Sequence, residues 1–310
     1  MNRLDRHTFF CIAILVAVVM SYVFSNSGLG DTKQYLENTL ALSEKESELV
    51  IGSHKSLFYV VLFAISKWIG TNPAFGIFAV GILSFVSVVL LGLREIRLNR
   101  SVIIFFTGLV IVTSPYFLYF FLSNIRSGLS FVLCWLGLVV VRPFYFRVFF
   151  MIAAFAAHQI ALFIVGIYFF YHTLKRLFGK CSFGIWFLAL SMLSGFVISF
   201  LVFDIGLGSF STEAWGSGIL YTVGYQIAFL AVCRLFWEDS FPSVAALSAL
   251  LFSVGCYIAD IHAVRMLSLS GVLCLFLALR HDGKDNKAKM LVMALLFALS
   301  FFHYYLIFRS

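Results

Sequence analysis

The stretch SVIIFFTGLVIVTSPYFLYFFLSNIRSGLSFVLCWLGLVVV, residues 101–141, contains one charged residue, Arg126. A helix of about 20 apolar residues crosses the hydrocarbon core of a bilayer, so this stretch is long enough for two crossings, one on each side of Arg126. An arginine at membrane depth costs roughly 2.5–3.5 kcal/mol on insertion scales. The stretch therefore predicts a helical fold embedded in a membrane, and Arg126 needs a physical explanation.

The composition of the whole chain extends this prediction. Of its 310 residues, 62% are hydrophobic and 12% are charged, and the mean hydropathy is +1.02, which leaves too little polar surface for a soluble domain. Apolar runs recur from Phe9 to Phe308, and the alternation of apolar and polar residues that membrane strands need is missing from them. We expect an all-α polytopic membrane protein with about 10–12 transmembrane helices in a single domain, residues 1–310.

The apolar runs also predict where the helices lie. We expect crossings at 8–25, 74–93, 101–122, 127–142, 144–157, 158–174, 183–203, 217–237, 242–259, 263–280 and 289–308. The segment 56–69 is short for a crossing and contains Lys67. If this segment does not cross, most Lys and Arg residues fall on the cytoplasmic side, as the positive-inside rule requires. We therefore predict a re-entrant or juxtamembrane helix at 56–69.

This topology predicts which parts of the chain face outward. They are the loop 26–55, the turn 123–127, the turn around His158, a second loop at 204–218 and the segment 260–265. The loop 26–55 is long for a connector between helices, which indicates a lid or a binding element. The first apolar segment resembles a signal peptide, but we expect it to stay as the first helix because no clear cleavage site follows it.

Several classes of function are disfavoured by the same patterns. The formal net charge of +8 does not indicate nucleic-acid binding, because Lys and Arg gather in short loops between helices. The sequence holds neither GxxxxGK[ST] nor GxGxxG after a strand, so nucleotide-driven activity is disfavoured. The cysteines lie mostly in apolar segments and form no CxxC pair. We expect neither structural disulfides nor a bound metal or other cofactor.

Arg126 lies beside a polar stripe. The stripe is spaced at steps of four, three and four residues, which is one helical face, and its members are Ser123, Ser127, Ser130 and Cys134. Gly128 and Gly137 should allow close packing of this helix. Arg126 is then either an interfacial arginine that reaches toward the headgroups or an anion-binding residue, since a guanidinium can hold two phosphate oxygens at once.

Two further groups of residues have the chemistry of a site. Asp260, His262 and Arg265 lie together at a predicted helix boundary. They either orient that helix at the interface or form a general base beside a phosphate-binding arginine. His158 is either a hydrogen-bonded interfacial residue or a second candidate base.

Three motifs carry a resemblance to a known family. Asp31, Tyr35 and Glu48 follow the first predicted helix, and NIRSGLS (124–130) and AAFAAHQIAL (153–162) come later. Over about residues 28–270 the chain resembles the EpsG-like, Wzy-type bacterial polysaccharide polymerases, which include O-antigen polymerases of lipopolysaccharide biosynthesis. It departs from the family pattern at Ser127, where Gln is common, and in ELVIGSHKS (48–56), where Glu-x-Gly-[FY] is expected.

The resemblance implies a GT-C-like fold and a glycosyltransferase that works at the outer leaflet of the bacterial inner membrane. Such an enzyme moves a growing glycan from undecaprenyl diphosphate to the next lipid-linked repeat unit. Its partners would be this oligosaccharide substrate, membrane lipids, a chain-length regulator and a flippase, and no nucleic acid. The implied roles are diphosphate binding by Arg126 and Arg265, proton transfer by Asp260, His262 or His158, and sugar binding by Asp31, Tyr35 and Glu48.

Two other functions stay open. A membrane acyltransferase that modifies surface sugars would also use His and Arg, but it needs polar residues reachable from the cytoplasm. A transporter or flippase of lipid-linked oligosaccharides would place polar residues near the midplane on broken helices.

Overall fold

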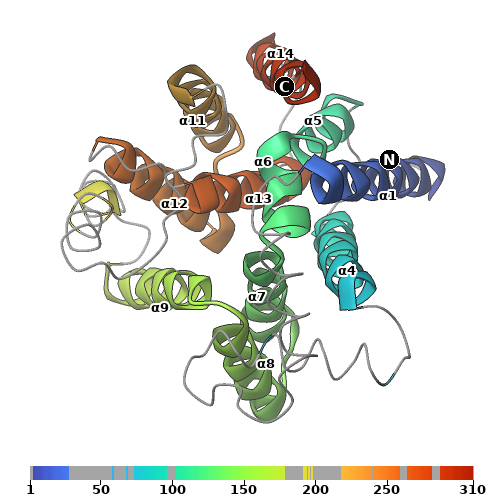
Figure 1. Ribbon diagram of the computed structural model, residues 1–310. Helices are drawn as coiled ribbons and strands as arrows, with labels where there is room; N and C mark the ends of the chain where they lie inside the picture. The colour runs from blue at the N-terminus through green and yellow to red at the C-terminus, as the bar shows by residue number, and fades with distance from the viewer. Residues whose placement is uncertain are drawn as a thin grey trace. The chain divides into compact units, whose positions relative to one another are not determined.

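The computed structural model describes residues 3–27, 58, 68, 73–95, 102–178, 191–193, 195, 197, 218–238, 240–258, 264–280 and 287–309. No strand occurs in these ranges, and the chain is helical there apart from short turns. The α-helices are labelled in Figure 1. The elements are α1 (Arg3–Ser27), α4 (Pro73–Glu95), α5 (Val102–Val112), α6 (Pro115–Leu118), the π-helix η1 (Tyr119–Ser123), α7 (Ile125–Trp135), the π-helix η2 (Leu136–Val140), α8 (Phe144–Ala157), α9 (Ile160–Phe178), α11 (Gly218–Leu235), α12 (Phe241–Ile258), α13 (Val264–Arg280) and α14 (Lys287–Arg309).

Several of these helices have the length and apolar composition that a membrane crossing requires. Three meet both conditions: Gly76–Arg94, Phe241–Ile258 and Lys287–Tyr305. The pair Phe106–Val112 and Pro115–Ser123 meets them together, and shorter apolar helices cover much of the remaining described chain. The prediction of an α-helical membrane protein is thus confirmed at this level, while the number of 10–12 crossings and the GT-C-like arrangement stay predictions.

Most predicted crossings coincide with helices of the structure, and the predicted crossing 101–122 coincides with helical segments that are separated by a bend. The chain bends by 55° between α5 and the segment that follows it. Pro115 has no N–H for a helical hydrogen bond, and the hydroxyls of Thr113 and Ser114 donate to carbonyls of α5 at 3.0 Å (Leu109) and 2.7 Å (Ile111). These three residues together end α5.

Some predicted features fall mainly outside the described residues. Of the predicted re-entrant segment 56–69 the structure describes Phe58 and Trp68, both helical. Of the predicted crossing 183–203 it describes five residues, all helical: 191–193, 195 and 197. The loop 26–55 beyond residue 27 and the loop 204–218 before α11 lie outside the described residues.

The described chain divides into two compact units. The α7 unit comprises Phe10–Leu91 and Leu118–Gly166, and the α13 unit comprises Met1–Phe9, Gly92–Phe117 and Ile167–Ser310. The chain therefore has two packing centres. The prediction of a single domain, residues 1–310, stays a prediction. Each unit is described separately below.

In the α7 unit, α7 and η2 pack against α8, which returns after a short turn. Glycines allow the backbones to come close: a Cβ on Gly137 would lie 3.2 Å from the carbonyl oxygen of Arg147 in α8. A Cβ on Gly128 would lie 2.8 Å from Cδ1 of Phe121 in η1. The predicted role of Gly128 and Gly137 in close packing is confirmed.

In the α13 unit, α13 is the central helix and packs against α5, α11 and α12. Its residues from Met266 to Leu279 are all buried. The hydroxyl of Ser270 donates to the carbonyl of Ala246 in α12 at 3.0 Å, so a hydrogen bond joins the two helices through their apolar contact. A helix that is apolar on all sides is buried in this way.

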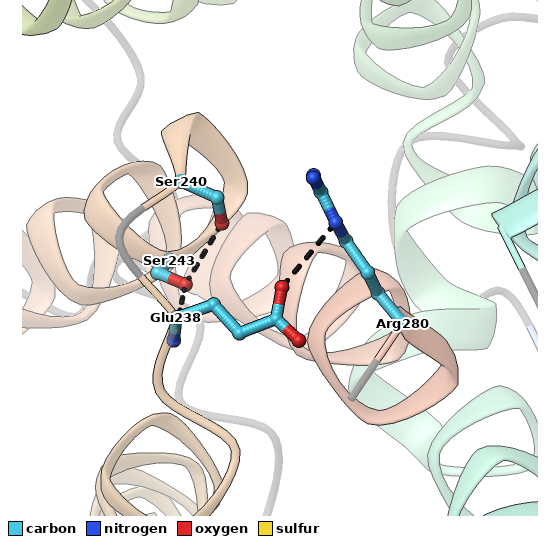
Figure 2. Close-up of polar contacts among 4 residues, drawn as sticks. All are labelled: Glu238, Ser240, Ser243 and Arg280. Carbon is cyan, nitrogen blue, oxygen red and sulfur yellow. Dashed lines mark hydrogen bonds and ion pairs between the residues drawn. The ribbon is translucent and has the colours of Figure 1, made fainter. Parts of the chain in front are cut away.

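An ion pair ties the turn between α11 and α12 to the end of α13. Nε of Arg280 lies 3.3 Å from Oε2 of Glu238, and both side chains are about one third exposed. Figure 2 shows Ser243 beside this pair, where its hydroxyl accepts the N–H of Glu238 at 3.3 Å and contacts the hydroxyl of Ser240 at 3.1 Å. The start of α12 and the end of α13 are held together at this point.

Because this pair is partly exposed, we expect Glu238→Gln to lower the free energy of unfolding by less than about 1 kcal/mol. A double-mutant cycle with Arg280→Gln in detergent micelles measures the coupling. Repetition at about 1 M salt should reduce it, since the Debye length then falls to roughly 3 Å. A coupling well above this value, or one insensitive to salt, would contradict the expectation.

The close approach of α4 to η1 should be more sensitive to substitution than this ion pair. A Cβ on Gly81 would lie 2.9 Å from the carbonyl oxygen of Phe121, a backbone atom that cannot rotate away. We expect Gly81→Ala to destabilise the protein by about 1–3 kcal/mol. Gly166→Ala is the control, because a Cβ there meets nothing within 4 Å and the change should be neutral or stabilising by about 0.5–1 kcal/mol. Thermal unfolding in micelles measures both, and equal effects of the two changes would refute the packing argument.

Candidate functional site

The candidate site lies at the start of α7, where Asn124 ends one helix and begins the next. Its N–H donates to the carbonyl of Tyr119 at 2.8 Å, which closes the π-helix η1. Its carbonyl accepts the N–H groups of Ser127 (3.0 Å) and Gly128 (3.2 Å), which open α7. Asn124 has φ −95° and ψ 56°, outside the helical region, as expected of an N-cap residue. Arg126 is therefore the second residue of α7, at a helix end that carries positive partial charge.

Arg126 is held inside the protein. Its side chain is 6% exposed, and its Nε–H donates to the carbonyl of Ala157 at 3.1 Å. Ala157 is the last residue of α8, where carbonyls have no partner within the helix and carry negative partial charge. Cζ of Arg126 also lies 5.8 Å from the centroid of the Phe58 ring, within the range of a cation–π contact. These contacts favour the embedded arginine over an arginine that reaches to the headgroups.

The polar stripe of α7 faces the end of α8 and the start of α9. The hydroxyl of Ser130 is 3.0 Å from the carbonyl oxygen of Ala154 and 3.1 Å from that of His158. Sγ of Cys134 lies 4.0 Å from the carbonyl oxygen of Ala161. Ser123, predicted as the first member of the stripe, is instead the last residue of η1, because α7 begins two residues later.

Two polar side chains at this helix end have no hydrogen-bond partner in the part of the chain that the structure describes. They are the amide of Asn124, at both Oδ1 and Nδ2, and the hydroxyl of Ser127. Both residues are fully buried, with 0% exposure. Each unsatisfied buried group costs about 1–3 kcal/mol, so the chain tolerates an appreciable loss of stability here. The sequence pattern gave no role to Asn124, although an Asn just before a predicted helix is a known N-cap signal that could have drawn attention to it.

His158 lies next to this helix end. It is 8% exposed, it follows the last residue of α8, and its Nδ1 accepts the N–H of Ile160 at 3.1 Å. A ring nitrogen that accepts a hydrogen bond carries no proton, so the neutral ring holds its proton on Nε2. In this tautomer Nε2 can donate a hydrogen bond, and the predicted role of His158 as a base stays a prediction.

Of the other predicted site residues, the structure describes Arg265. Arg265 is the second residue of α13, half-buried, in the α13 unit. The remaining predicted residues lie outside the described residues: Asp260, His262, Asp31, Tyr35 and Glu48. Within the described residues, no group of three or more His, Cys, Asp or Glu side chains could hold a metal ion.

The helices that carry the two arginines share a pattern. Arg126 and Arg265 each occupy the second position of a helix, and each of these helices has a buried serine that donates across to an alanine carbonyl of its neighbour. The bonds are Ser130 to Ala154 and Ser270 to Ala246, both 3.0 Å. Each unit thus presents an arginine at the positive end of a well-packed helix.

Comparison of the chain with models of protein families, with curated proteins and with solved structures finds no match. What can be said about function accordingly comes from the residues and the geometry described above. The feature that stands out is a buried arginine at a helix start, next to side chains that find no hydrogen-bond partner among the described residues.

We expect Ser130→Ala to lower the free energy of unfolding and Ser127→Ala not to lower it. Ser130→Ala removes a hydrogen bond between α7 and α8 and should lower the free energy of unfolding by about 0.5–1.5 kcal/mol. Ser127→Ala removes a hydroxyl without a partner and should be neutral or stabilising. Reversible unfolding of the purified protein without added ligand, in mixed micelles, measures both, and a clear loss of stability in Ser127→Ala would show that its hydroxyl is satisfied in the folded protein.

Proposed function

We propose that this protein is a polysaccharide polymerase, a glycosyltransferase that acts on oligosaccharides linked to undecaprenyl diphosphate. The observation that carries the proposal is Arg126, buried at the start of α7 between Asn124 and Ser127, whose side chains have no hydrogen-bond partner in the described ranges of the chain. A permanent positive charge at the positive end of a helix is a favourable place for a phosphoryl group. A lipid-linked diphosphate brings that group to the membrane.

The proposed reaction uses the arginine where negative charge develops. The bond between the anomeric carbon of the donor glycan and the diphosphate oxygen breaks, and the polyprenyl diphosphate leaves with growing negative charge. Arg126, and Arg265 at the corresponding position of α13, bind donor or acceptor diphosphates. An arginine that is already fixed, as Arg126 is by Ala157, stabilises this charge with little reorganisation.

The second half of the reaction needs a proton acceptor. The hydroxyl oxygen of the next repeat unit bonds to the anomeric carbon, and its proton passes to a base, a role worth about 10²–10⁴-fold in rate. We assign this role to Asp260 or His262, with His158 as the alternative, and sugar binding to Asp31, Tyr35 and Glu48. The activated donor supplies the energy, so the reaction consumes no nucleotide.

The proposal also has a cellular context. A polymerase of this class belongs in the bacterial inner membrane with its site facing the periplasm or exterior. It would take its substrate from a flippase and work beside a chain-length regulator. The basic residues of the predicted cytoplasmic loops support this orientation.

A transporter of lipid-linked oligosaccharides is a second candidate, and one observation favours it. The chain bends by 55° between α5 and Pro115–Ser123, and transporters commonly use such broken helices near their substrate sites. The polymerase is preferred because the polar groups described here gather at one helix end next to an arginine. The experiment below separates the two.

We expect a host that lacks this protein to lose the ladder of its surface polysaccharide and retain a single repeat unit. Wild type should restore the ladder. Arg126→Lys should lose most of this activity, because an ammonium group cannot form the paired hydrogen bonds of a planar guanidinium. A gel of extracted polysaccharide is the readout.

Arg147→Lys is the matched control. Arg147 also donates its Nε–H to a backbone carbonyl, that of Val141 at 2.6 Å, but it is exposed at the start of α8. The control should restore the ladder. Full activity of Arg126→Lys would refute the role of the guanidinium. Loss of even the single repeat in the deletion would favour the transporter, and a ladder with altered acylation would favour an acyltransferase.

A further inference from the structure

The side chain of Asn124 does not form the hydrogen bonds that are usual for an N-cap residue. An N-cap side chain normally accepts an N–H of the first helical turn, but the side chain of Asn124 makes no capping bond. Its Nδ2 is a donor and its Oδ1 an acceptor, and both are buried without a partner in the described part of the chain. A group that satisfies Asn124 must therefore offer an acceptor and a donor close together.

The side chain of Ser127 places a second constraint on the group that binds here. Ser127 is the third residue of α7, so it lies one helical turn from Asn124 at the same helix end. Its buried hydroxyl also lacks a partner and can donate a hydrogen bond. The helix end thus presents two donors, Nδ2 of Asn124 and the hydroxyl of Ser127, beside the amide oxygen Oδ1 of Asn124, which only accepts.

This mixture of donors and acceptor discriminates between ligands. A bare diphosphate has only acceptor oxygens when ionised, so it could satisfy Nδ2 of Asn124 and the hydroxyl of Ser127 but would leave Oδ1 unmet. A phosphate that carries a sugar offers acceptor oxygens and, next to them, hydroxyl donors. Sites that bind a hydroxyl by hydrogen bonds reject ligands that lack it, because the polar groups of the site are then left unpaired.

We propose that Asn124 and Ser127 bind the junction between sugar and phosphate in the lipid-linked substrate. Nδ2 of Asn124 and the hydroxyl of Ser127 donate to phosphoryl oxygens, and Oδ1 of Asn124 accepts from a hydroxyl of the first sugar. This inference rests on the proposed function and names the part of the substrate that this helix end recognises. It makes Asn124 the residue that separates a glycosylated diphosphate from the bare diphosphate that is released.

The test uses two probes with the purified full-length protein in detergent micelles. They are farnesyl diphosphate and farnesyl diphosphate that carries one N-acetylglucosamine, and calorimetric titration gives a Kd for each. We expect wild type to bind the glycosylated probe roughly tenfold more tightly or better, the equivalent of one satisfied buried hydrogen bond. Asn124→Leu, of similar size, should lose this preference and bind the two probes within about twofold. Ser127→Ala should weaken both probes by a similar factor.

A stability measurement without ligand accompanies the titration. Asn124→Leu should unfold at the same or a higher temperature than wild type, since it removes a polar group that the protein does not satisfy. The matched control is Gln226→Leu, because the amide of Gln226 is also buried but donates to the hydroxyl of Ser253 at 3.3 Å. That variant should lose stability and keep the preference for the glycosylated probe. Asn124→Ala, which introduces no bulk, repeats the test.

The outcomes separate the inference from the proposed function. If wild type binds both probes equally, or Asn124→Leu and Asn124→Ala keep the preference, the role of Asn124 is refuted while the polymerase proposal stands. If both variants are destabilised without ligand, Asn124 is satisfied within the protein, for example by a buried water, and the inference is again refuted. If neither probe binds to wild type, both the inference and the proposed function are refuted.

Discussion

The carbonyl groups at the end of α8 set the constraint on which the α7 unit depends. A helix that ends in buried surroundings leaves its last carbonyls without partners within the helix. In this chain Arg126 donates to the carbonyl of Ala157, the last residue of α8. The hydroxyl of Ser130 lies within 3.1 Å of the carbonyls of Ala154 and His158, which also accept the N–H groups of His158 and Ala161. The buried arginine thus provides a hydrogen-bond donor to the last carbonyl of α8.

The same bond also fixes the position of the charge of Arg126. It fixes the guanidinium through Nε at the positive end of α7, so the charge is held in place before any ligand arrives. Nearby, the side chains of Asn124 and Ser127 are unsatisfied within the described part of the chain, which costs stability that a helix end with a side-chain cap avoids. A local loss of stability at a well-packed charge is typical of a site selected for binding.

Irregular backbone flanks α7 at both of its ends. The π-helix η1 precedes α7, the π-helix η2 follows it, and Pro115 with two hydroxyl residues ends α5 further upstream. Irregular helices of this kind recur at functional sites, and in membranes they persist only where the freed backbone groups find partners. The backbone of Asn124 shows how this is done, since its N–H closes η1 and its carbonyl opens α7. The side chain is thereby left without a capping bond.

The sequence by itself determined the helical membrane fold, the approximate limits of most helices and the polar face of α7, because apolar length and helical spacing are local properties of the chain. It also singled out Arg126 and His158, since charge or a titratable group stands out in apolar sequence. Only the tertiary structure decided that Arg126 bonds to the carbonyl of Ala157, next to His158, and that Ser123 belongs to η1. It also decided that the chain bends before Pro115 and that the side chain of Asn124 has no partner within the described residues. The reason is that hydrogen-bond partners such as the carbonyl of Ala157 are backbone groups, identical in every residue, and only packing determines which of them lie within reach.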